Sequence, residues 1–352
     1  MDGKIVTAVG TPNKALIMYW GNRNTQLNLP FNSSLSITLG GDLQAKTSVV
    51  FSKSFKEDVI YFNGERIVLN GKAEGKMAAL KLVLDQMRKM AGTTSKVLVV
   101  SKNSFPTGTG MASSAAGAVA FVYAASEALG LSLDTAQKSI LARNISGSAC
   151  RSLDGGFVMW HKGSNPDGSD SYAEQVADHR HWSEIIDMIA IVSEKQKKVS
   201  STEGHKRTSS TSVLFKARVP YADAAVQAIR ESILQKDFDS LAEITMQDSN
   251  NLQATMLDSW PPIVYLNSTS HEIIEAIHEL NEREGRYVAA YTFDAGPNAH
   301  IITRTRDKAK VKEALSGING IKQLIEVPQG DGPKILDESE SLIDPETLKP
   351  VA

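Results

Sequence analysis

The alternation of apolar and polar residues predicts β-strands in the first part of the chain. The segments 35–39 (LSITL) and 47–52 (TSVVFS) are rich in residues that favour strands. The segment 58–71 (DVIYFNGERIVLNG) holds two short apolar runs on either side of Asn63 and Gly64. Asn-Gly favours a tight turn because both residues tolerate a positive φ angle. We therefore expect a β-hairpin at this point.

A helical period follows the hairpin. Apolar residues recur at every third or fourth position from 74 to 91, and Gly92 stands where a helix would end. The segment 96–131 then gives a strand, a glycine-rich loop and a long helix of small residues, in that order. A strand, a loop and a helix in this sequence suit the binding of a phosphate group.

The second half of the chain begins with a polar loop, 163–171, and a new apolar strand at 185–193. Amphipathic helices are expected at about 220–237, 238–249 and 269–283. Strands at 286–293 and 299–303 flank the turn 294–298 (DAGPN). We expect an α+β protein of two lobes, with boundaries at 1–182 and 183–325, and a polar tail, 326–352, that lies across the surface.

The composition excludes several classes of partner. The chain has 352 residues, with 38 Lys plus Arg against 40 Asp plus Glu, so no overall basic field attracts nucleic acid or an anionic membrane. Its apolar runs fall short of the about 20 residues of a membrane span, and the N-terminus lacks the order of a signal peptide. We expect a cytoplasmic protein.

Cysteine and histidine give no sign of a metal site. Cys150 is the only cysteine, so an intrachain disulfide is excluded, and its small neighbours favour packing over a nucleophilic role. The seven histidines form no H-E-x-x-H pattern, and the pair in 179–181 (HRH) lacks a clear third ligand. We expect no bound metal.

The strongest local motif is the segment 106–121 (PTGTGMASSAAGAVAF). Its glycines expose backbone N–H groups, Ser113 and Ser114 add hydroxyl donors, and the helix directs its positive dipole end to the same point. The motif matches neither a P-loop nor a dinucleotide-binding fingerprint. It predicts a phosphate site, and the alternative is an ordinary loop that leads into a packed helix.

Three further segments carry candidate chemistry. Arg151, among the small residues of 146–156, suits recognition of a carboxylate or phosphate, although a structural pair with Asp154 remains open. Ser200 and Ser201 stand in a basic segment that either binds an anion or is a solvated loop. Asp294 follows an apolar strand and precedes a Gly-Pro turn, so it either projects into a cleft or merely forms the turn.

Taken together, these segments resemble the mevalonate diphosphate decarboxylases of the GHMP kinase superfamily. The resemblance covers nearly the whole chain and rests on YWG, LNLPFNSSLSITL, FPTGTGMASSAAG, SGSACRSLDGG, VSSTEG, MLDSWPPIVYLN, YTFDAGPNA and ESLIDPETLKP. It implies a two-lobed GHMP-kinase-like fold with the active-site cleft between the lobes, and a homodimer. Members of the family phosphorylate the 3-hydroxyl of mevalonate 5-diphosphate with ATP and then release phosphate and carbon dioxide.

The resemblance also assigns roles to residues. It implies that Asp294 is catalytic, that Arg151 holds the substrate carboxylate and that Asn13 orients Arg151. The 5-phosphoryl end of the substrate is assigned to Tyr19, Ser146, Gly147 and Ser148. Positions near the transferred phosphate are Ser113, Ser114, Ser200, Ser201 and Thr202. His205, where relatives generally have Met, would add a proton or a charge.

The opening segment departs from the family pattern. The family reads Asn-Ile-Ala-x-x-Lys-Tyr-Trp-Gly-Lys, whereas this chain has Met18 and Asn22 at the two lysine positions. The first lysine assists phosphoryl transfer, and the second contacts the outer phosphate of the 5-diphosphate. A substrate that already carries a 3-phosphate, and only one phosphate at position 5, needs neither cation. The alternatives are that Lys14 or Arg23 compensates, or that the site has lost its activity.

We therefore expect an ATP-independent decarboxylase that converts mevalonate 3,5-bisphosphate to isopentenyl phosphate, carbon dioxide and phosphate, in an archaeal-type mevalonate pathway. No cofactor would be required. The main alternatives are ATP-dependent decarboxylases of mevalonate 5-phosphate or mevalonate 5-diphosphate, which would need ATP and magnesium. A different small-molecule kinase and a non-catalytic sensor of mevalonate phosphates complete the hypotheses.

Overall fold

The computed structural model describes residues 3–70, 73–104, 113–195 and 197–351, and within these ranges three larger sheets and one short ribbon are found. The first sheet has the order β16-β1-β6-β9-β7-β8, with β1 (Ile5–Gly10), β6 (Ala45–Ser52), β7 (Val59–Phe62), β8 (Glu65–Val68), β9 (Lys96–Asn103) and β16 (Lys334–Ile335). The second has the order β11-β10-β5-β2, with β2 (Asn13–Ile17), β5 (Ser34–Thr38), β10 (Phe157–Trp160) and β11 (Ala173–Ala177). The ribbon pairs β3 (Asn22–Asn24) with β4 (Leu29–Pro30).

The third sheet belongs to the second half of the chain. Its order is β13-β14-β12-β15, with β12 (Ile185–Ile191), β13 (Ala289–Phe293), β14 (Ala299–Arg304) and β15 (Gln323–Pro328). The α-helices are α1 (Gly75–Ala91), α2 (Ser113–Ala128), α3 (Thr135–Ile145), α4 (Ser201–Thr211), α5 (Phe215–Gln235), α6 (Phe238–Leu257), α7 (Ser268–Glu284) and α8 (Lys308–Leu315). Two short 3₁₀ helices are η1 (Gly147–Ser152) and η2 (Glu338–Glu340).

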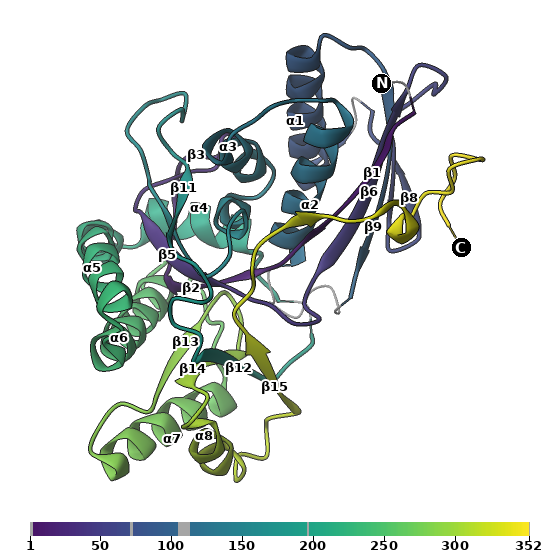
Figure 1. Ribbon diagram of the computed structural model, residues 1–352. Helices are drawn as coiled ribbons and strands as arrows, with labels where there is room; N and C mark the ends of the chain where they lie inside the picture. Colours follow the sequence, from purple (N-terminus) through teal and green to yellow (C-terminus); the bar gives the residue numbers. More distant parts are fainter. Residues whose placement is uncertain (1–2, 71–72, 105–112, 196, 352) are drawn as a thin grey trace.

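Helices cover one face of the first sheet, and the C-terminal segment covers the other (Figure 1). Val83 of α1 and Val119 of α2 are buried against Val49 and Val99 of the sheet. On the opposite face, Ile343 of the C-terminal segment is buried against Val50. Side chains of β6 and β9 point alternately to these two covered faces, which explains why most of their residues are buried.

The hairpin predicted at Asn63 and Gly64 is confirmed. Strands β7 and β8 pair in antiparallel register from Val59 to Val68, and both turn residues have positive φ angles of 48° and 89°. The end of α1 at Gly92 is also confirmed, since Gly92 adopts a left-handed conformation with φ of 63°.

Helix α6 is longer than the predicted 238–249. The polar residues after position 249 resemble a helix end, but they bind partners elsewhere in the fold. Asn251 accepts a hydrogen bond from Arg218, Asn250 donates to Tyr291 Oη, and Gln253 donates to the carbonyl of Asp294. Polar residues inside a helix therefore connect α6 to its neighbours, and the helix continues to Leu257.

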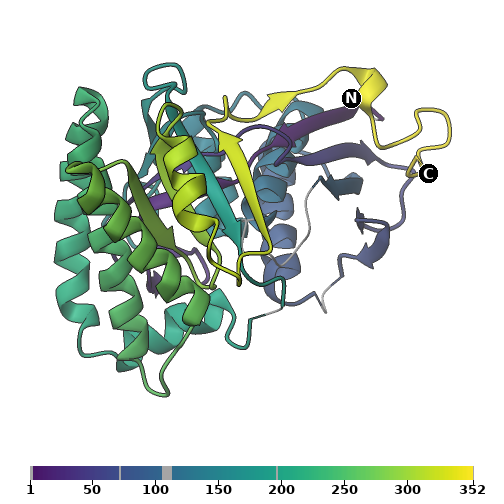
Figure 2. The same cartoon turned by 90° about the horizontal axis from the view of Figure 1, so that it is seen from below.

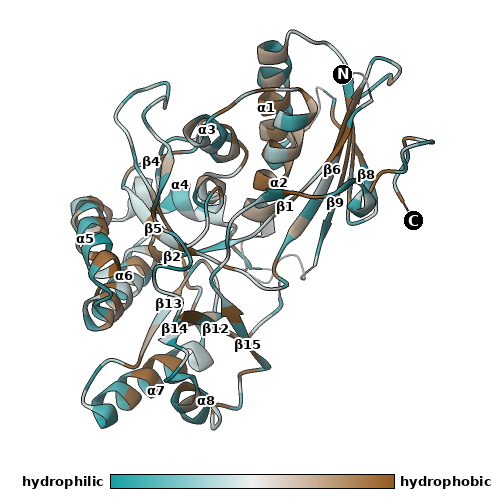
Figure 3. Ribbon diagram, viewed as in Figure 1, coloured by the Kyte–Doolittle hydropathy of each residue, from teal (hydrophilic) through white to brown (hydrophobic). Residues whose placement is uncertain are grey.

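Helices α5, α6 and α7 lie on one side of the third sheet, away from α1 on the other side of the molecule (Figure 2). They carry both hydrophobic and hydrophilic stretches, as amphipathic helices do (Figure 3). The two halves share one hydrophobic core, which includes Ile37 of β5 and Ile189 of β12. Trp182 itself belongs to this core. The boundary near residue 182 stays a prediction.

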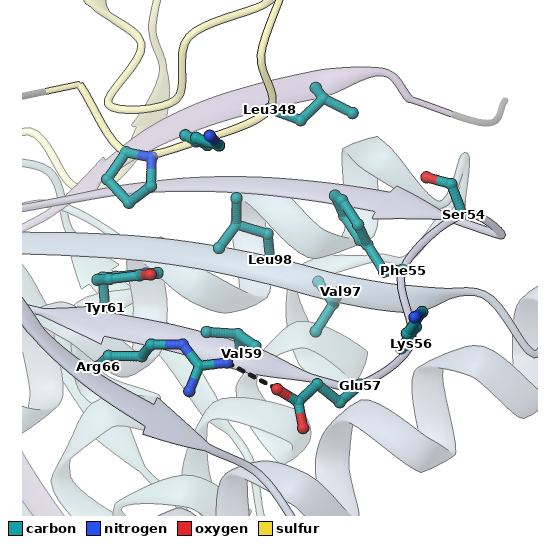
Figure 4. A pocket seen from close by; sticks show the side chains of 12 residues that line it. Ser54, Phe55, Lys56, Glu57, Val59, Tyr61, Arg66, Val97, Leu98 and Leu348 are labelled. Atoms are coloured by element: carbon teal, nitrogen blue, oxygen red, sulfur yellow. Dashed lines mark hydrogen bonds and ion pairs between the residues drawn. The ribbon is translucent and has the colours of Figure 1, made fainter.

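The tail is less superficial than its polarity suggests. Val327 lies in β15 and is buried, and Ala8 of β1 pairs with Ile335 of β16. A pocket of about 320 Å³ lies between the tail and the part of the first sheet that holds β7, β8 and β9 (Figure 4). Phe55, Tyr61 and Leu348 line it. Across the described part of the chain, no helix is long and apolar enough to cross a membrane.

A buried ion pair allows the first prediction. Asp58 accepts hydrogen bonds from Arg88 and from the backbone N–H of Val97, and both charged side chains are buried. The substitution Asp58→Ala removes the buried partner of Arg88 and leaves it only the half-exposed Asp85, at 3.2 Å. We therefore expect the free energy of unfolding to fall by about 3 kcal/mol in urea titrations.

The control is the neighbouring Glu57→Ala. Glu57 pairs with Arg66 at 2.6 Å, but both side chains are about half exposed. An exposed pair contributes about 0–1 kcal/mol. Equal losses in the two variants would contradict the importance assigned to the buried pair.

Candidate active site

Arg151 lies in η1 and is held by neutral partners. Its Nη1 donates to Ser34 Oγ at 2.7 Å, and its Nε donates to Asn13 Oδ1 at 3.3 Å. Asn13 in turn donates to Ser152 Oγ at 2.8 Å. Burial is the largest cause that lowers the pKa of Arg151, but a guanidinium remains a cation at neutral pH. Among the described residues no carboxylate forms an ion pair with Arg151. The open pairing with Asp154 is therefore not found.

The small residues before Arg151 allow a close approach of Tyr19. A Cβ atom on Gly147 would lie 2.5 Å from Tyr19 Oη, so a larger residue would displace the ring. Ser146 and Ser148 flank Gly147 and are half-buried. The backbone carbonyl of Ser148 accepts a hydrogen bond from Asn13 at 2.9 Å. The residues that the resemblance assigns to the 5-phosphoryl end therefore lie beside those that hold Arg151.

His205 of α4 is stacked between two aromatic rings. Its ring centroid lies 4.7 Å from that of Tyr19 and 4.2 Å from that of Trp20, and its Nδ1 accepts a hydrogen bond from the N–H of Gly21 at 2.8 Å. Burial, followed by the positive charge of Lys197, lowers the pKa of His205 to about 3. The ring is therefore neutral at pH 7 and does not supply the expected charge. Burial likewise raises the pKa of Tyr19 to about 12.

Asp294 follows β13 and forms an ion pair with Lys14 of β2. The Lys14 side chain is 1% exposed, whereas that of Asp294 is 30% exposed. Burial alone raises the pKa of Asp294, but the positive charge of Lys14, assisted by His300 and Lys197, outweighs burial and holds the pKa below its usual value. The carboxylate is therefore anionic at neutral pH and still accessible to a ligand.

Met18 lies in an apolar cluster rather than at a charged surface. Its side chain packs with Trp20, Leu252 and Met256. Its N–H donates to Asp248 Oδ2 at 2.9 Å, and its carbonyl accepts from Arg218 at 3.0 Å. The cation absent at position 18 is instead supplied by Lys14 of β2, four residues earlier in the chain. Arg23 is directed elsewhere, to carbonyl oxygens of 162 and 165.

The N-terminus of α4 adds a second cation. Ser200 caps this helix by accepting from the N–H of Glu203, and Ser201 Oγ accepts a hydrogen bond from Lys197 Nζ at 3.2 Å. Thr202 lies in the first turn. Burial lowers the pKa of Lys197, and the negative charge of Asp294 opposes this effect. Hydroxyl groups, a helix N-terminus and an ammonium group thus gather near Asp294, an arrangement that suits an anion.

The remaining predicted residues are only partly described. Ser113 and Ser114 begin α2, as expected, whereas positions 106–112 of the glycine-rich motif lie outside the described residues. Asn22 begins β3, and its Oδ1 is buried without a hydrogen-bond partner among the described residues. Cys150 is buried, and burial raises its pKa to about 12, which disfavours the thiolate and agrees with a packing role.

The sequence alone does not single out Lys197, because Lys195 and Lys198 stand beside it. Its spacing of three residues before the helix cap at Ser200 is the one signal for it. Desolvation, followed by the charge of Lys197, also lowers the pKa of Lys76 in the first turn of α1. Two ammonium groups therefore lie near each other, and such a pair suits a ligand that carries several negative charges.

This geometry combines an anionic carboxylate with cations on several sides. Lys14 and Lys197 neutralise charge near Asp294, while Arg151 presents a fixed guanidinium from η1. An arrangement of this kind can hold a substrate that carries both a carboxylate and phosphate groups, and it can stabilise charge that develops during phosphoryl transfer.

Comparisons with known proteins agree with this chemistry. Residues 10–173 match the family model "Diphosphomevalonate decarboxylase-like N-terminal domain", and residues 187–341 match "Mevalonate 5-diphosphate decarboxylase C-terminal domain". A diphosphomevalonate decarboxylase from Debaryomyces hansenii is 40% identical over 98% of this chain and 91% of its own length. The solved structure of mevalonate diphosphate decarboxylase from Trypanosoma brucei has a TM-score of 0.88 and 34% identity, covering 97% of this chain and all of its own. The predicted α+β fold of the GHMP kinase type is confirmed.

The expectation that no cofactor is required is wrong. A related structure with a TM-score of 0.83 and 33% identity, covering 95% of this chain and 99% of its own, is a complex with MVAPP, AMPPCP and magnesium, so this relative binds an ATP analogue. The physical reason for the error lies at Lys14. Met18 in place of the family lysine suggests the loss of a catalytic cation, whereas in the structure Lys14 of β2 supplies a cation to Asp294. The ATP-independent branch is not supported, and the homodimer and the cytoplasmic location stay predictions.

The ion pair of Asp294 gives the second prediction. In Lys14→Met the carboxylate keeps its burial, which raises the pKa, but loses the largest opposing cause. We expect Asp294 to become protonated at a higher pH than in the unmodified protein. A ¹³C NMR titration of selectively labelled aspartate carboxyl groups measures this shift.

Lys162→Met is the matched control. Lys162 forms its ion pair with Asp223, at 2.5 Å, and not with Asp294. Its removal should leave the titration of Asp294 unchanged. An unchanged titration in Lys14→Met as well would show that the ion pair does not set the charge of Asp294.

Proposed function

The chain belongs to the diphosphomevalonate decarboxylase family, and from this premise we propose that it decarboxylates mevalonate 5-diphosphate in an ATP-dependent reaction. The products are isopentenyl diphosphate, ADP, phosphate and carbon dioxide. The chain is a carboxy-lyase of the mevalonate pathway, so the sensor hypothesis is wrong. The observation that carries the proposal is the ion pair between Lys14 and Asp294, which restores the cation missing at Met18.

Asp294 acts on the carbon that bears the 3-hydroxyl group. Its carboxylate accepts the hydroxyl proton as the oxygen attacks the phosphoryl group, and Lys14 offsets the negative charge that gathers there. Asp294, whose side chain is 30% exposed, then releases this proton to solvent and is a carboxylate again. When the 3-phosphate departs, positive charge develops on the tertiary carbon. At about 4 Å and an effective dielectric constant of about 20, a carboxylate stabilises such a charge by roughly 4 kcal/mol.

Arg151 binds the carboxylate of the substrate. Asn13 and Ser34 fix two nitrogen atoms of its guanidinium, which leaves further N–H groups for a ligand. An arginine held in this way orients the carboxylate so that its bond to the α-carbon can break. The electron pair of that bond forms the new double bond, and carbon dioxide leaves.

ATP supplies the phosphoryl group that turns the tertiary hydroxyl into a leaving group, and magnesium offsets part of the phosphate charge. The chain offers fitting partners for a polyphosphate in Lys197, in the hydroxyl groups of Ser200 to Thr202, and in the N-terminus of α2 at Ser113 and Ser114. The mutual proximity of Lys76 and Lys197 supports this assignment.

The 5-monophosphate is a second candidate substrate. The resemblance assigns position 22 to the outer phosphate of the 5-diphosphate, and Asn22 carries no charge. The adjacent Arg23 donates to backbone carbonyls and does not replace the missing lysine. This arrangement favours mevalonate 5-phosphate, with isopentenyl phosphate as the product.

The requirement for ATP is tested directly. We expect carbon dioxide and phosphate from mevalonate 5-diphosphate or 5-phosphate only when ATP and magnesium are present, with one ADP formed for each carbon dioxide. Release of carbon dioxide without ATP would overturn the proposal. Formation of ADP without carbon dioxide would instead indicate a kinase.

Asp294→Asn tests the role of the carboxylate. Loss of roughly 4 kcal/mol of electrostatic stabilisation corresponds to a decrease in kcat of about a thousandfold. Asp239→Asn, at an exposed position of α6, is the control and should keep the activity of the unmodified enzyme. Full activity in Asp294→Asn would remove this residue from the mechanism.

Asn22→Lys tests the choice between the two substrates. A charge-assisted hydrogen bond contributes about 1.5 kcal/mol or more, so the variant should gain about tenfold in kcat/KM for the 5-diphosphate relative to the 5-phosphate. The unmodified enzyme should prefer the 5-phosphate if Asn22 sets specificity. An unchanged ratio of kcat/KM values would show that position 22 does not contact the outer phosphate.

A further inference from the structure

A histidine and an aspartate form a buried pair inside the third sheet. Asp187 lies on β12, His300 lies on β14, and the side chains are 0% and 5% exposed. His300 Nδ1 and Asp187 Oδ2 are 2.5 Å apart. Their surroundings on the two strands are mainly Ile, Met and Ala. Two ionisable groups in such an apolar sheet require an explanation.

The strand register places this pair on the same face as Asp294. His300 lies opposite Thr292 of β13 and opposite Ile189 of β12, and Asp187 is two residues from Ile189. Side chains at positions that are opposite, or two residues apart on one strand, share a face. Asp294 stands two residues beyond Thr292, just after the end of β13. The pair of Asp187 and His300 therefore lies on the face of the sheet that leads to Asp294, and the charge of His300 acts on that carboxyl.

The opposite face of the sheet has a different role. Tyr291 points towards the helices, where its hydroxyl contacts Asn250 of α6 and His278 of α7. The row that contains His300 faces the side from which Lys14 of β2 reaches Asp294. The buried pair is thus directed towards the site and not towards the helical layer.

Packing does not account for the pair. Burying a carboxylate is costly unless it has a partner, and a buried ion pair is often no more stable than apolar residues of similar volume. Asp187 Oδ1 has no hydrogen-bond partner among the described residues, so its burial is incompletely compensated. Apolar residues at both positions would complete the Ile-rich sheet at a lower cost.

We propose that Asp187 and His300 are positioning residues that support Asp294 from the sheet side. Asp187 accepts the Nδ1 proton of His300 and orients the ring, and the oriented ring supports the Asp294 carboxylate. The catalytic meaning of this support rests on the function proposed above for Asp294.

Other charges act on the same carboxylate and belong in the account. The groups that face Asp294 are Lys14 from β2, Lys197 from the segment before α4, Arg151 from η1, Tyr19 after β2 and His300 from β14. Burial raises the pKa of Asp294, and the charges of Lys14, His300 and Lys197 lower it in that order. The influence of His300 on Asp294 therefore comes second to that of Lys14, and it is the one that comes from the third sheet itself.

The test compares pH profiles of kcat/KM. The double variant Asp187→Ala/His300→Val replaces the pair with apolar side chains, and Asp187→Asn removes the carboxylate charge that faces His300. Asp294 must be anionic, and His300 contributes to the low pKa of this carboxyl. Loss of that contribution should therefore move the acid limb of the profile upward by about one pH unit. At pH values below the acid limb, such a shift corresponds to a loss of kcat/KM of about tenfold. At higher pH, where Asp294 is anionic in every variant, the loss should disappear.

His278→Gln is the matched control, because His278 lies on the opposite side of the same sheet and contacts Tyr291. Its acid limb should not move. Thermal melting identifies a variant that has lost its fold; if the double variant unfolds, Asp187→Asn carries the test. The proposal would be overturned if the acid limb of the kcat/KM profile had the same pH midpoint in the folded variants as in the unmodified protein. A loss of activity that is equal at every pH would also overturn it.

A titration without substrate separates this proposal from the proposed function. The ¹³C signal of the Asp294 carboxyl should titrate at a higher pH in the folded variants than in the unmodified protein, whether or not the protein decarboxylates mevalonate 5-diphosphate. An unchanged titration would overturn the pair's role. Absence of ATP-dependent decarboxylation in the unmodified protein would overturn the function alone.

Discussion

The ammonium group of Lys14 and the carboxylate of Asp294 come from opposite halves of the chain and meet below the surface. The lysine is almost completely buried, and a buried cation without a partner is strongly destabilising. Strand β2 and the turn after β13 are therefore held in one relation to each other. Strand β2 also fixes the position of Arg151, because Asn13, next to Lys14, accepts a hydrogen bond from the guanidinium group. One buried contact thus relates the acidic and the basic groups of the site.

The end of β2 is held by a second set of contacts with the C-terminal half. Asp248 of α6 and Arg218 of α5 bind the N–H and the carbonyl of Met18, and Asn32 donates to the same carbonyl at 3.0 Å. Beyond Met18, the rings of Tyr19 and Trp20 enclose His205. The opening segment is consequently fixed by groups from the second half of the chain. Its sequence cannot be interpreted without them.

The parts of the fold that depend on local chemistry were predictable. The turn at Asn63 and Gly64 and the end of α1 at Gly92 follow from residues that favour a positive φ angle. Asp294 and Arg151 could be identified as candidates from their motifs. The function of Lys14 could not be decided, because whether it reaches Asp294 depends on how the fold places β2 beside a turn that stands 280 residues later in the chain. The same limit applies to Asp187 and His300, whose contact arises only from the register of β12 and β14.

The pairing of β1 with β16 constrains the order in which the protein can be completed during synthesis. Ala8 lies opposite Ile335, and the N–H of Leu342 donates to Ser48 Oγ, so the edge of the first sheet is finished by a segment that leaves the ribosome long after its partner. Until then one side of β1 exposes unpaired backbone groups, and the apolar face with Val50 and Val100 lacks the cover that Ile343 provides. The nascent chain therefore carries an uncovered sheet edge through most of its translation, a state in which binding by a chaperone would protect it from aggregation.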